Sequence, residues 1–197
     1  MAGKKTKVVD KWKSKKWYTV IAPSMFEGKE IAEVVASDDK LLQNRIVRKS
    51  LMELGTGGAS QLAMFTNLRF RLTDVSGATV HTKLVGYDIA SSYIKTFARR
   101  GKSLIHQIVD GKTKDNEELR LKIIAVTGAR VSENTKRNIR QALVEETLKG
   151  VTEGNFEDVM QDLLFGKFSS RIFTRLKQIT RMRRVEVWKS ERKENFK

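Results

Sequence analysis

The sequence contains no cysteine, one proline and two histidines. The lack of cysteine excludes disulfide bonds and thiolate metal sites, and it is typical of a reducing compartment, so we expect a cytoplasmic protein. Proline cannot donate to a sheet ladder, so Pro23 is expected at a strand end, a sheet edge or a bulge. His81 and His106 each fall in a predicted strand, and neither has a partner at the spacing of a metal or catalytic motif,.

Long apolar runs are also missing. No run approaches the roughly 18–20 residues that a bilayer crossing needs, and the lysine-rich beginning has no apolar segment of the kind found in secretory signals. We therefore expect no membrane partner. A phosphate-binding P-loop is absent too, because Gly101-Lys102-Ser103 and Gly111-Lys112-Thr113 both lack the glycine that should stand five positions upstream,.

No catalytic constellation is recognisable in the sequence. The carboxylates form scattered adjacent pairs such as Asp38-Asp39 and Glu145-Glu146, which usually lie in turns and on helix surfaces. No nucleophile, base and orienting group can be assembled from them. We expect a protein that is not an enzyme, with no catalytic residue, no metal, no cofactor and no small-molecule substrate.

Positive charge is what the sequence has in excess. It contains 39 Lys and Arg against 23 Asp and Glu, which gives a net charge of +16. So large an excess predicts a polyanionic partner, and nucleic acid fits better than an anionic membrane surface. Hydrophobic residues make up 40% of the chain, enough for one globular domain with a core,.

The middle of the chain predicts a largely antiparallel sheet. In Asn67–Thr73, apolar and polar residues alternate with the period of two that marks a strand with one buried face,. Thr79–Ile89 is a second extended run after a turn at Gly77. Leu104–Val109 and Leu119–Thr127 are two more, and the polar stretch between them reads as a hairpin connection.

A short basic helix is predicted inside this sheet, at Ser91–Arg100. Ser91 or Ser92 is expected as its N-cap. Tyr93, Ile94 and Phe97 lie three and four residues apart and should share a face that the core holds. The opposite face and the exit turn are strongly basic. A solvated helix face is the alternative explanation for this charge.

Other elements are predicted around the central sheet. Strands are expected at Trp17–Phe26, Glu30–Ala36 and Arg45–Leu51, helices at Asn138–Lys149, Asn155–Phe165 and Ser169–Thr180, and a last strand at Arg181–Trp188. A helix over Leu41–Leu54 is the alternative to the third strand, which should end in a helical turn at Leu51–Leu54. The α+β chain should then consist of a basic arm (1–16), one domain (17–190) and a basic tail (189–197). Within the domain we expect a β-rich part (17–131), a helical part (132–180) and a final strand (181–188).

The basic arm interleaves two tryptophans with its lysines. It has seven lysines against Asp10 alone and no apolar stripe that could order it,. Aromatic side chains among basic ones suit stacking on unpaired bases beside phosphate contacts. The alternative is that Trp17, or Trp12, packs in the core. The residues expected to bind RNA are Lys4, Lys5, Lys7, Lys11, Trp12, Lys13, Lys15, Lys16, Lys95, Arg99, Arg100, Lys102, Arg181, Arg183 and Arg184.

Several segments, in order along the chain, resemble one family. Lys15–Phe26, Phe70–Gly77, Gly86–Ile89 and Val109–Asp115 are similar to the small-subunit ribosomal protein family shared by archaea and eukaryotes, called S-three-A-e or S-one-e. Arg99-Arg100 with Ser103–Ile105 resembles the basic turn of that family. The resemblance extends over most of residues 15–190 and fits the archaeal form. Gly101 is a departure, because many relatives are expected to have tryptophan there.

The resemblance implies a structural protein of the small ribosomal subunit. It implies a β-barrel-like, mostly antiparallel core with flanking C-terminal helices and basic extensions. It also implies a place on the platform near the messenger RNA exit, with the 3′ region of the ribosomal RNA, neighbouring ribosomal proteins and messenger RNA as partners. The alternatives are a regulatory RNA-binding protein outside the ribosome and a metal-dependent RNA-processing enzyme.

Overall fold

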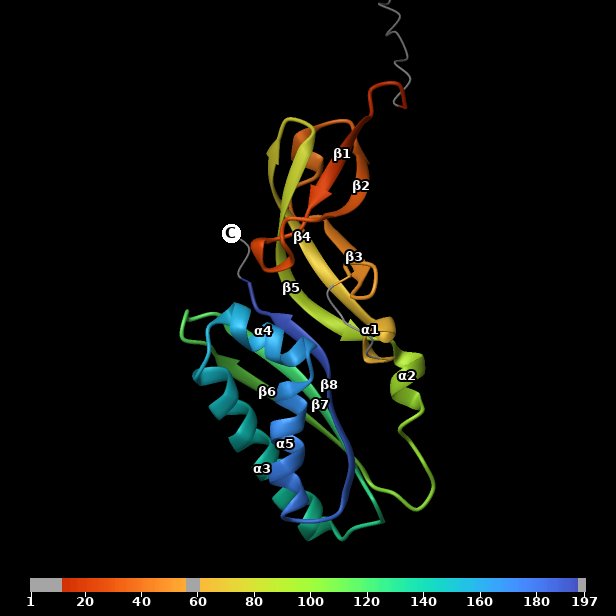
Figure 1. Ribbon diagram of the computed structural model, residues 1–197, viewed down its shortest axis with the longest axis vertical. Coiled ribbons are helices and arrows are strands. Elements are labelled where there is room, and N and C mark those ends of the chain that lie inside the picture. Colours follow the sequence, from red (N-terminus) through yellow and green to blue (C-terminus); the bar gives the residue numbers. More distant parts are fainter. Residues whose placement is uncertain (1–11, 56–60, 195–197) are drawn as a thin grey trace, which may run out of the picture. The chain divides into compact units, whose positions relative to one another are not determined.

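The computed structural model describes residues 12–55 and 61–194 (Figure 1). Its strands are β1 (Lys16–Ile21), β2 (Glu30–Ala36), β3 (Ile46–Ser50), β4 (Thr66–Ser76), β5 (Thr79–Ile89), β6 (Leu104–Lys112), β7 (Glu118–Thr127) and β8 (Met182–Arg192). Its helices are α1 (Gln61–Phe65), α2 (Ser91–Lys95), α3 (Glu133–Thr152), α4 (Phe156–Leu164) and α5 (Lys167–Lys177), with short 3-10 helices η1 (Ser24–Phe26) and η2 (Asp39–Leu41).

The mostly antiparallel, β-rich fold with C-terminal helices is confirmed. The eight strands form one hydrogen-bonded sheet whose main path runs β2-β1-β5-β8-β7-β6, with β4 pairing with β3 and β5, so the sheet is open at β2 and β6. The described residues fall into two compact units. Unit 1 contains the residues up to Val47 and Phe70–Leu84, and unit 2 contains Arg48–Arg69 and the residues from Val85 onward. The single domain over 17–190 stays a prediction.

Unit 1 is built around strand β1. This strand pairs antiparallel with β2 and parallel with the first part of β5. Its alternation buries Tyr18 and Val20, and the Tyr18 hydroxyl donates a hydrogen bond to Asp39 Oδ1 at 2.6 Å. The rings of Phe26 and Phe70 meet edge to face in the same core, with centroids 5.6 Å apart. Pro23 directly precedes η1 after the end of β1, as its missing N–H requires,.

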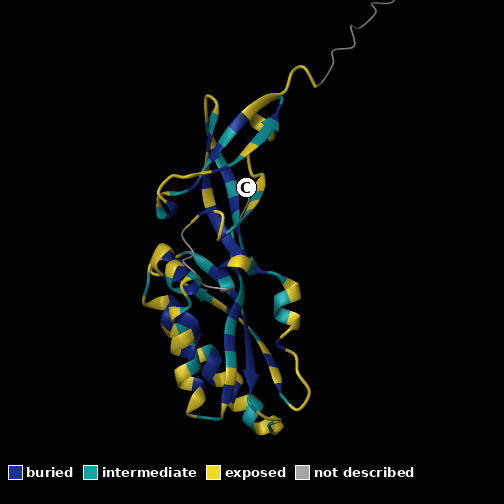
Figure 2. Cartoon of the chain, turned by 45° about the vertical axis from the view of Figure 1, so that its right-hand side comes forward, coloured by how far each residue is buried: buried dark blue, intermediate teal, exposed yellow. Residues whose placement is uncertain are grey.

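Unit 2 is a sheet with helices α3, α4 and α5 on one face (Figures 1 and 2). Here β8 lies between the second part of β5 and β7, and β6 is the edge strand. The odd-numbered residues of β7 from Leu119 to Ala125 are fully buried. They share the face that α3 covers. Gly111 of β6 lies opposite Leu119 and faces the same way, and a Cβ at Gly111 would lie 3.1 Å from Val151 Cγ1 of α3.

Two helix predictions are wrong in detail. Helix α2 begins after Ala90 rather than after a serine, and it ends at Lys95, where the Thr96 hydroxyl donates to the Tyr93 carbonyl at 2.6 Å. Helix α3 runs from Glu133 to Thr152 rather than from Asn138 to Lys149. Gly150 lies inside it and allows close packing, since a Cβ at Gly150 would lie 2.6 Å from the Phe168 ring.

Strands β6 and β8 both continue beyond their predicted ends. Strand β6 continues through Asp110 to Lys112, so the hairpin connection is confined to residues 113–117, where the Thr113 amide donates to the Glu117 carbonyl. Strand β8 continues to Arg192, so residues 189–192 pair with β7 instead of forming a free tail. Both extensions are polar at every exposed position, and a polar strand end has no alternation that marks it in the sequence.

Candidate nucleic-acid interface

The connection from α2 to β6 is held on the sheet by Phe97. This ring is 6% exposed and packs with Ile124 and Val126 of β7, with Tyr93, Ile94 and Trp188 beside it. The predicted apolar face of the segment is therefore confirmed. Because Ile124 and Val126 point to the face opposite that of Ile123 and Ala125, this cluster covers the sheet on the side away from α3. The basic residues that follow Phe97 are thus carried on an anchored segment.

Buried hydrogen bonds fix the end of the same connection. The Ser103 amide donates to Thr127 Oγ1 at 3.0 Å, and the Thr127 amide donates to the Ser103 carbonyl at 3.0 Å. The Thr127 hydroxyl donates to the Ala129 carbonyl at 2.6 Å, and the Val131 amide donates to Ser103 Oγ at 3.2 Å. Both Ser103 and Thr127 are buried. Gly101 has φ +72°, a conformation that suits glycine and that tryptophan would adopt only with strain,.

The start of β8 approaches the segment after β7 closely at Gly128. The Gly128 amide donates to the Arg181 carbonyl at 2.7 Å. A Cβ on Gly128 would lie 3.1 Å from Arg181 Cγ and 3.2 Å from its carbonyl oxygen, so a larger residue would push the two segments apart. Residues from two distant parts of the chain, just before α3 and just before β8, are brought together in this way.

Four cations converge at this point, and we call Arg99, Lys102, Arg181 and Arg183 the basic cluster. Lys102, Arg181 and Arg183 line a cleft of about 420 Å³. Burial lowers the pKa of the Lys102 ammonium, and the positive charges of Arg183, Arg99 and Arg181 lower it further. Like charges are held together here without an acidic side chain among the residues that line the cleft. Such an arrangement favours an anion, which would relieve the mutual repulsion.

The other predicted basic residues of this region are placed differently. Lys95 and Arg100 are exposed on the same connection. Arg184 is drawn inward: its Nη2 donates to the Tyr93 hydroxyl, and its Nε donates to Glu186 Oε1 at 3.2 Å. Its guanidinium carbon lies 4.7 Å from the Phe97 ring centroid and 5.1 Å from that of Tyr93. This arginine ties β8 to α2, so much of its hydrogen-bonding capacity is already used.

Two exposed tryptophans lie in the described part of the arm and directly after it. Trp12 is 67% exposed, and Lys15 Nζ lies 4.3 Å above its ring. Trp17 is 65% exposed, so its placement in the core is wrong although it does belong to the first strand. The reason is the period of two, which points Trp17 away from the face that buries Tyr18 and Val20. Lys13, Lys15 and Lys16 are exposed beside these rings, whereas Lys4, Lys5, Lys7 and Lys11 lie outside the described residues.

The sequence did not distinguish paired from unpaired basic residues in the sheet. Arg120 and Lys122 of β7 each meet a carboxylate. Arg120 binds Asp110 through two nitrogens, and Lys122 lies 3.3 Å from Glu191. Arg130 was missed as a candidate. It is exposed, and it sits between Gly128 and Val131, whose backbones bind Arg181 and Ser103.

Residues 12–55 and 61–194 hold no group of three or more His, Cys, Asp or Glu side chains placed to bind a metal ion. Within the same ranges, no helix combines the length and the apolar character needed to span a bilayer.

A basic cluster on an anchored turn, exposed tryptophans and a net charge of +16 place the molecule in the class of polyanion-binding α+β proteins,. The chain belongs to the Ribosomal S3Ae family, whose family model matches residues 3–194. It is 36% identical over 187 residues to small ribosomal subunit protein eS1 of Sulfurisphaera tokodaii, covering 95% of each chain.

Other archaeal relatives agree. The chain is 36% identical over 190 residues to small ribosomal subunit protein eS1 of Staphylothermus marinus, covering 96% of this chain and 88% of the relative. The protein of the same name from Methanobrevibacter smithii is 32% identical over 185 residues, covering 94% of each chain. These matches confirm the family resemblance that the sequence motifs indicated.

Proposed function

We propose that this protein is a structural constituent of the small ribosomal subunit and that it binds ribosomal RNA. The family and the names of the archaeal relatives support the ribosomal role. The observation that carries RNA binding is the convergence of Arg99, Lys102, Arg181 and Arg183 around one cleft. Its role in translation is architectural rather than catalytic, and it acts in the cytoplasm as part of the ribosome.

The proposed mechanism is neutralisation of phosphates by two groups of basic side chains, with two tryptophans that stack on bases beside them. The basic cluster, together with Lys95 and Arg100, supplies contacts from a rigid turn, and arginine makes forked contacts to phosphate oxygens that lysine does not. The arm supplies Lys4, Lys5, Lys7, Lys11, Lys13, Lys15 and Lys16. Trp12 and Trp17 stack on unpaired bases. Arg184 contributes to the surface mainly by positioning β8 next to α2.

The proposed location is the platform of the small subunit near the messenger RNA exit. There the protein would contact the 3′ region of the ribosomal RNA, neighbouring ribosomal proteins and messenger RNA leaving the subunit. The support for this finer placement is the family resemblance carried by the motifs at Lys15–Phe26 and Phe70–Gly77. The single domain over 17–190 and the arm over 1–16 belong to the same proposal.

The test replaces three residues of the basic cluster together: Arg99→Ala, Lys102→Ala and Arg181→Ala. Arg137→Ala, Arg140→Ala and Lys149→Ala form the matched control, because these exposed residues of α3 remove the same charge elsewhere. After a high-salt wash and sucrose-gradient sedimentation, tagged wild-type and control proteins should stay with small subunits. The cluster variant should be largely lost from them.

Two outcomes would contradict the proposal. Wild-type protein that leaves the subunits entirely in the wash would instead be a regulatory RNA-binding protein. A cluster variant that sediments with the subunits as fully as the control would mean that the basic cluster does not carry binding.

A further inference from the structure

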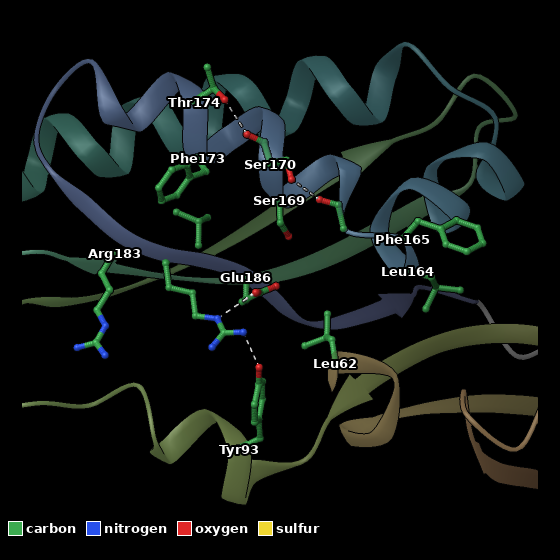
Figure 3. A pocket seen from close by; sticks show the side chains of 13 residues that line it. Leu62, Tyr93, Leu164, Phe165, Ser169, Ser170, Phe173, Thr174, Arg183 and Glu186 are labelled. Atoms are coloured by element: carbon green, nitrogen blue, oxygen red, sulfur yellow. Dashed lines mark hydrogen bonds and ion pairs between the residues drawn. The ribbon is translucent and has the colours of Figure 1, made fainter. Parts of the chain in front are cut away.

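A second cavity adjoins the basic cluster, within unit 2 (Figure 3). Its volume is about 530 Å³, which falls in the range of about 300–1,000 Å³ typical of sites for small ligands. Helix α5 forms one wall with Ser170, Phe173 and Thr174, and β8 forms the facing wall with Arg183, Arg184 and Glu186. Tyr93 and Leu62 close the side opposite α5. The cavity is thus large enough for one nucleotide.

Flat side chains line this cavity. Phe173 projects from α5 toward β8 (Figure 3) and is half-buried. The Arg184 guanidinium is held by its hydrogen bond to Tyr93 and by its packing on the Phe97 ring. The Tyr93 ring is itself stacked on Phe65, with centroids 4.5 Å apart and planes 11° apart. A base gains most from stacking on surfaces that are already fixed, because little side-chain entropy is then lost.

One carboxylate defines the polar side of the cavity. The Glu186 side chain is 14% exposed, and its Oε1 accepts from Arg184 Nε at 3.2 Å. Burial raises the pKa of this carboxyl group, and Arg184 opposes that shift. No hydrogen bond to Oε2 is found among the described residues. A carboxylate accepts several N–H donors, so Glu186 can bind a ligand that presents two donors side by side.

Guanine presents such a pair on its Watson–Crick edge, at N1 and N2. Adenine offers one amino donor beside the acceptor N1, which the carboxylate would repel. Reading an unstacked base by its Watson–Crick edge and by stacking is the usual way in which proteins recognise single-stranded RNA. The carboxylate therefore favours guanine over adenine.

Arg183 connects the cavity with the basic cluster. It lines both the 530 Å³ cavity and the 420 Å³ cleft that Lys102 and Arg181 also line. Its side chain is exposed, and no ion pair to it is found in the described part of the chain. A phosphate on Arg183 would hold the RNA backbone at the mouth of the cavity, with the attached base directed inward.

We infer that this cavity binds a single unstacked guanine of RNA, with Glu186 on its Watson–Crick edge, Phe173 against its face and Arg183 on its phosphate. The inference rests on the proposed RNA-binding function and adds base selectivity to it. The basic cluster would then bind any RNA segment, and the adjoining cavity would determine which nucleotide of that segment lies beside the cluster.

The experiment measures the binding of two fluorescein-labelled hexanucleotides, UUGUUU and UUAUUU, to the full chain by anisotropy. Wild-type protein should bind the guanine oligonucleotide roughly tenfold more tightly than the adenine one. Glu186→Gln should remove this preference, because an amide presents one acceptor and one donor group in place of two acceptors. Phe173→Ala should weaken binding of the guanine oligonucleotide about tenfold through lost stacking.

Matched controls are Glu145→Gln on α3 and Ile108→Ala on β6, both exposed and outside the cavity, which should leave the preference unchanged. Equal wild-type affinities for the two oligonucleotides would overturn the inference, and so would a guanine preference that survives Glu186→Gln. Failure of the proposed function has a different signature. In that case neither oligonucleotide binds, or the cluster variant of Arg99, Lys102 and Arg181 binds both as tightly as wild type.

Discussion

Asp110 illustrates how single residues of the β6–β7 hairpin are tied together. Its carboxylate accepts from Arg120 Nε at 2.8 Å, from Arg120 Nη2 at 2.9 Å and from Lys193 Nζ at 3.0 Å. Arg120 lies directly opposite it in the strand register. The hydrogen bonds from Arg120, with those from Lys193, hold the pKa of Asp110 far below its usual value, although burial opposes the shift. The ionised form is therefore the one that the fold stabilises.

The first prediction concerns pH and stability. Asp110→Asn should lower the free energy of unfolding at pH 7 by roughly 0.5–1 kcal/mol, because the pair is bidentate but partly exposed. A depressed carboxyl pKa contributes stability that is present above the unfolded-state value and is lost as pH falls toward the folded-state value. In urea titrations, the difference between wild type and Asp110→Asn should therefore shrink below about pH 4.

The control for this prediction is Asp74→Asn, which removes an exposed carboxylate near the end of β4. It should change stability by less than about 0.5 kcal/mol. A deficit of Asp110→Asn that stays constant from pH 7 to pH 2 would show that the carboxylate charge is not its source.

At the scale of elements, α2 has only five residues, too few to be stable as a helix alone,. Its place depends on Phe97, which packs on Ile124 and Val126 and lies under the Arg184 guanidinium. Phe97→Ala should lower the free energy of unfolding by roughly 3–5 kcal/mol. Arg99→Ala with Arg100→Ala should change it by less than about 0.5 kcal/mol. Chemical denaturation of both variants measures this.

Comparing Phe97→Ala with the double arginine variant separates the residue that anchors the segment from the residues that contact RNA. Binding to small-subunit RNA should fall strongly for the double arginine variant, while its stability stays near that of wild type. Lysine replacements at Arg99 and Arg100 should restore only part of the affinity, because lysine lacks the forked geometry. If the double arginine variant unfolds at a lower denaturant concentration than wild type yet still binds RNA normally, these arginines are structural.

How far each element could be predicted depended on its pattern of apolar and polar residues. The alternation of Leu68, Phe70 and Leu72 indicated β4 correctly, because one face of that strand is buried and the other is not. Helix α2 was predicted too long because the basic run Arg99-Arg100 is compatible with helix, whereas the backbone after Lys95 changes to i→i−3 hydrogen bonds. The polar ends of β6 and β8 had no periodic signal.

The candidate sites are formed by segments that are distant in the sequence and close in space. Arg99, Lys102, Arg181 and Arg183 were each predicted from local charge, but nothing local showed that they meet. The cavity beside them could not be predicted at all, since Tyr93, Phe173 and Glu186 come from three elements. Trp17 was ambiguous because a tryptophan in a strand can face either way, and the register of β1 decided its exposure.

At the scale of the whole molecule, the net charge of +16 governs association with RNA. Binding should weaken with salt by roughly 0.7–0.9 log units in affinity per log unit of salt for each phosphate contacted. Lys4→Ala, Lys5→Ala and Lys7→Ala together should lower that slope by roughly 2 if each lysine contacts one phosphate. Titrations of small-subunit RNA at salt concentrations from about 50 to about 200 mM would provide the slopes.

Sequence preference should not change in this arm variant, because phosphate contacts position the protein without reading bases. The hexanucleotide pair provides that check. A slope equal to that of wild type would mean that these three lysines do not touch phosphates.

The position of β8 in the sheet has a consequence for how the protein is made. This strand comes last of all the described elements along the chain, yet it lies between β5 and β7 rather than at an edge. During synthesis, β6 and β7 can pair as a hairpin early, and α3, α4 and α5 follow. The middle of the sheet stays open until residues 182–192 have left the translating ribosome. A nascent chain interrupted before that point lacks the strand that joins β5 to β7. Incomplete copies therefore cannot complete the sheet, and they are exposed to proteolysis before they can enter a ribosome.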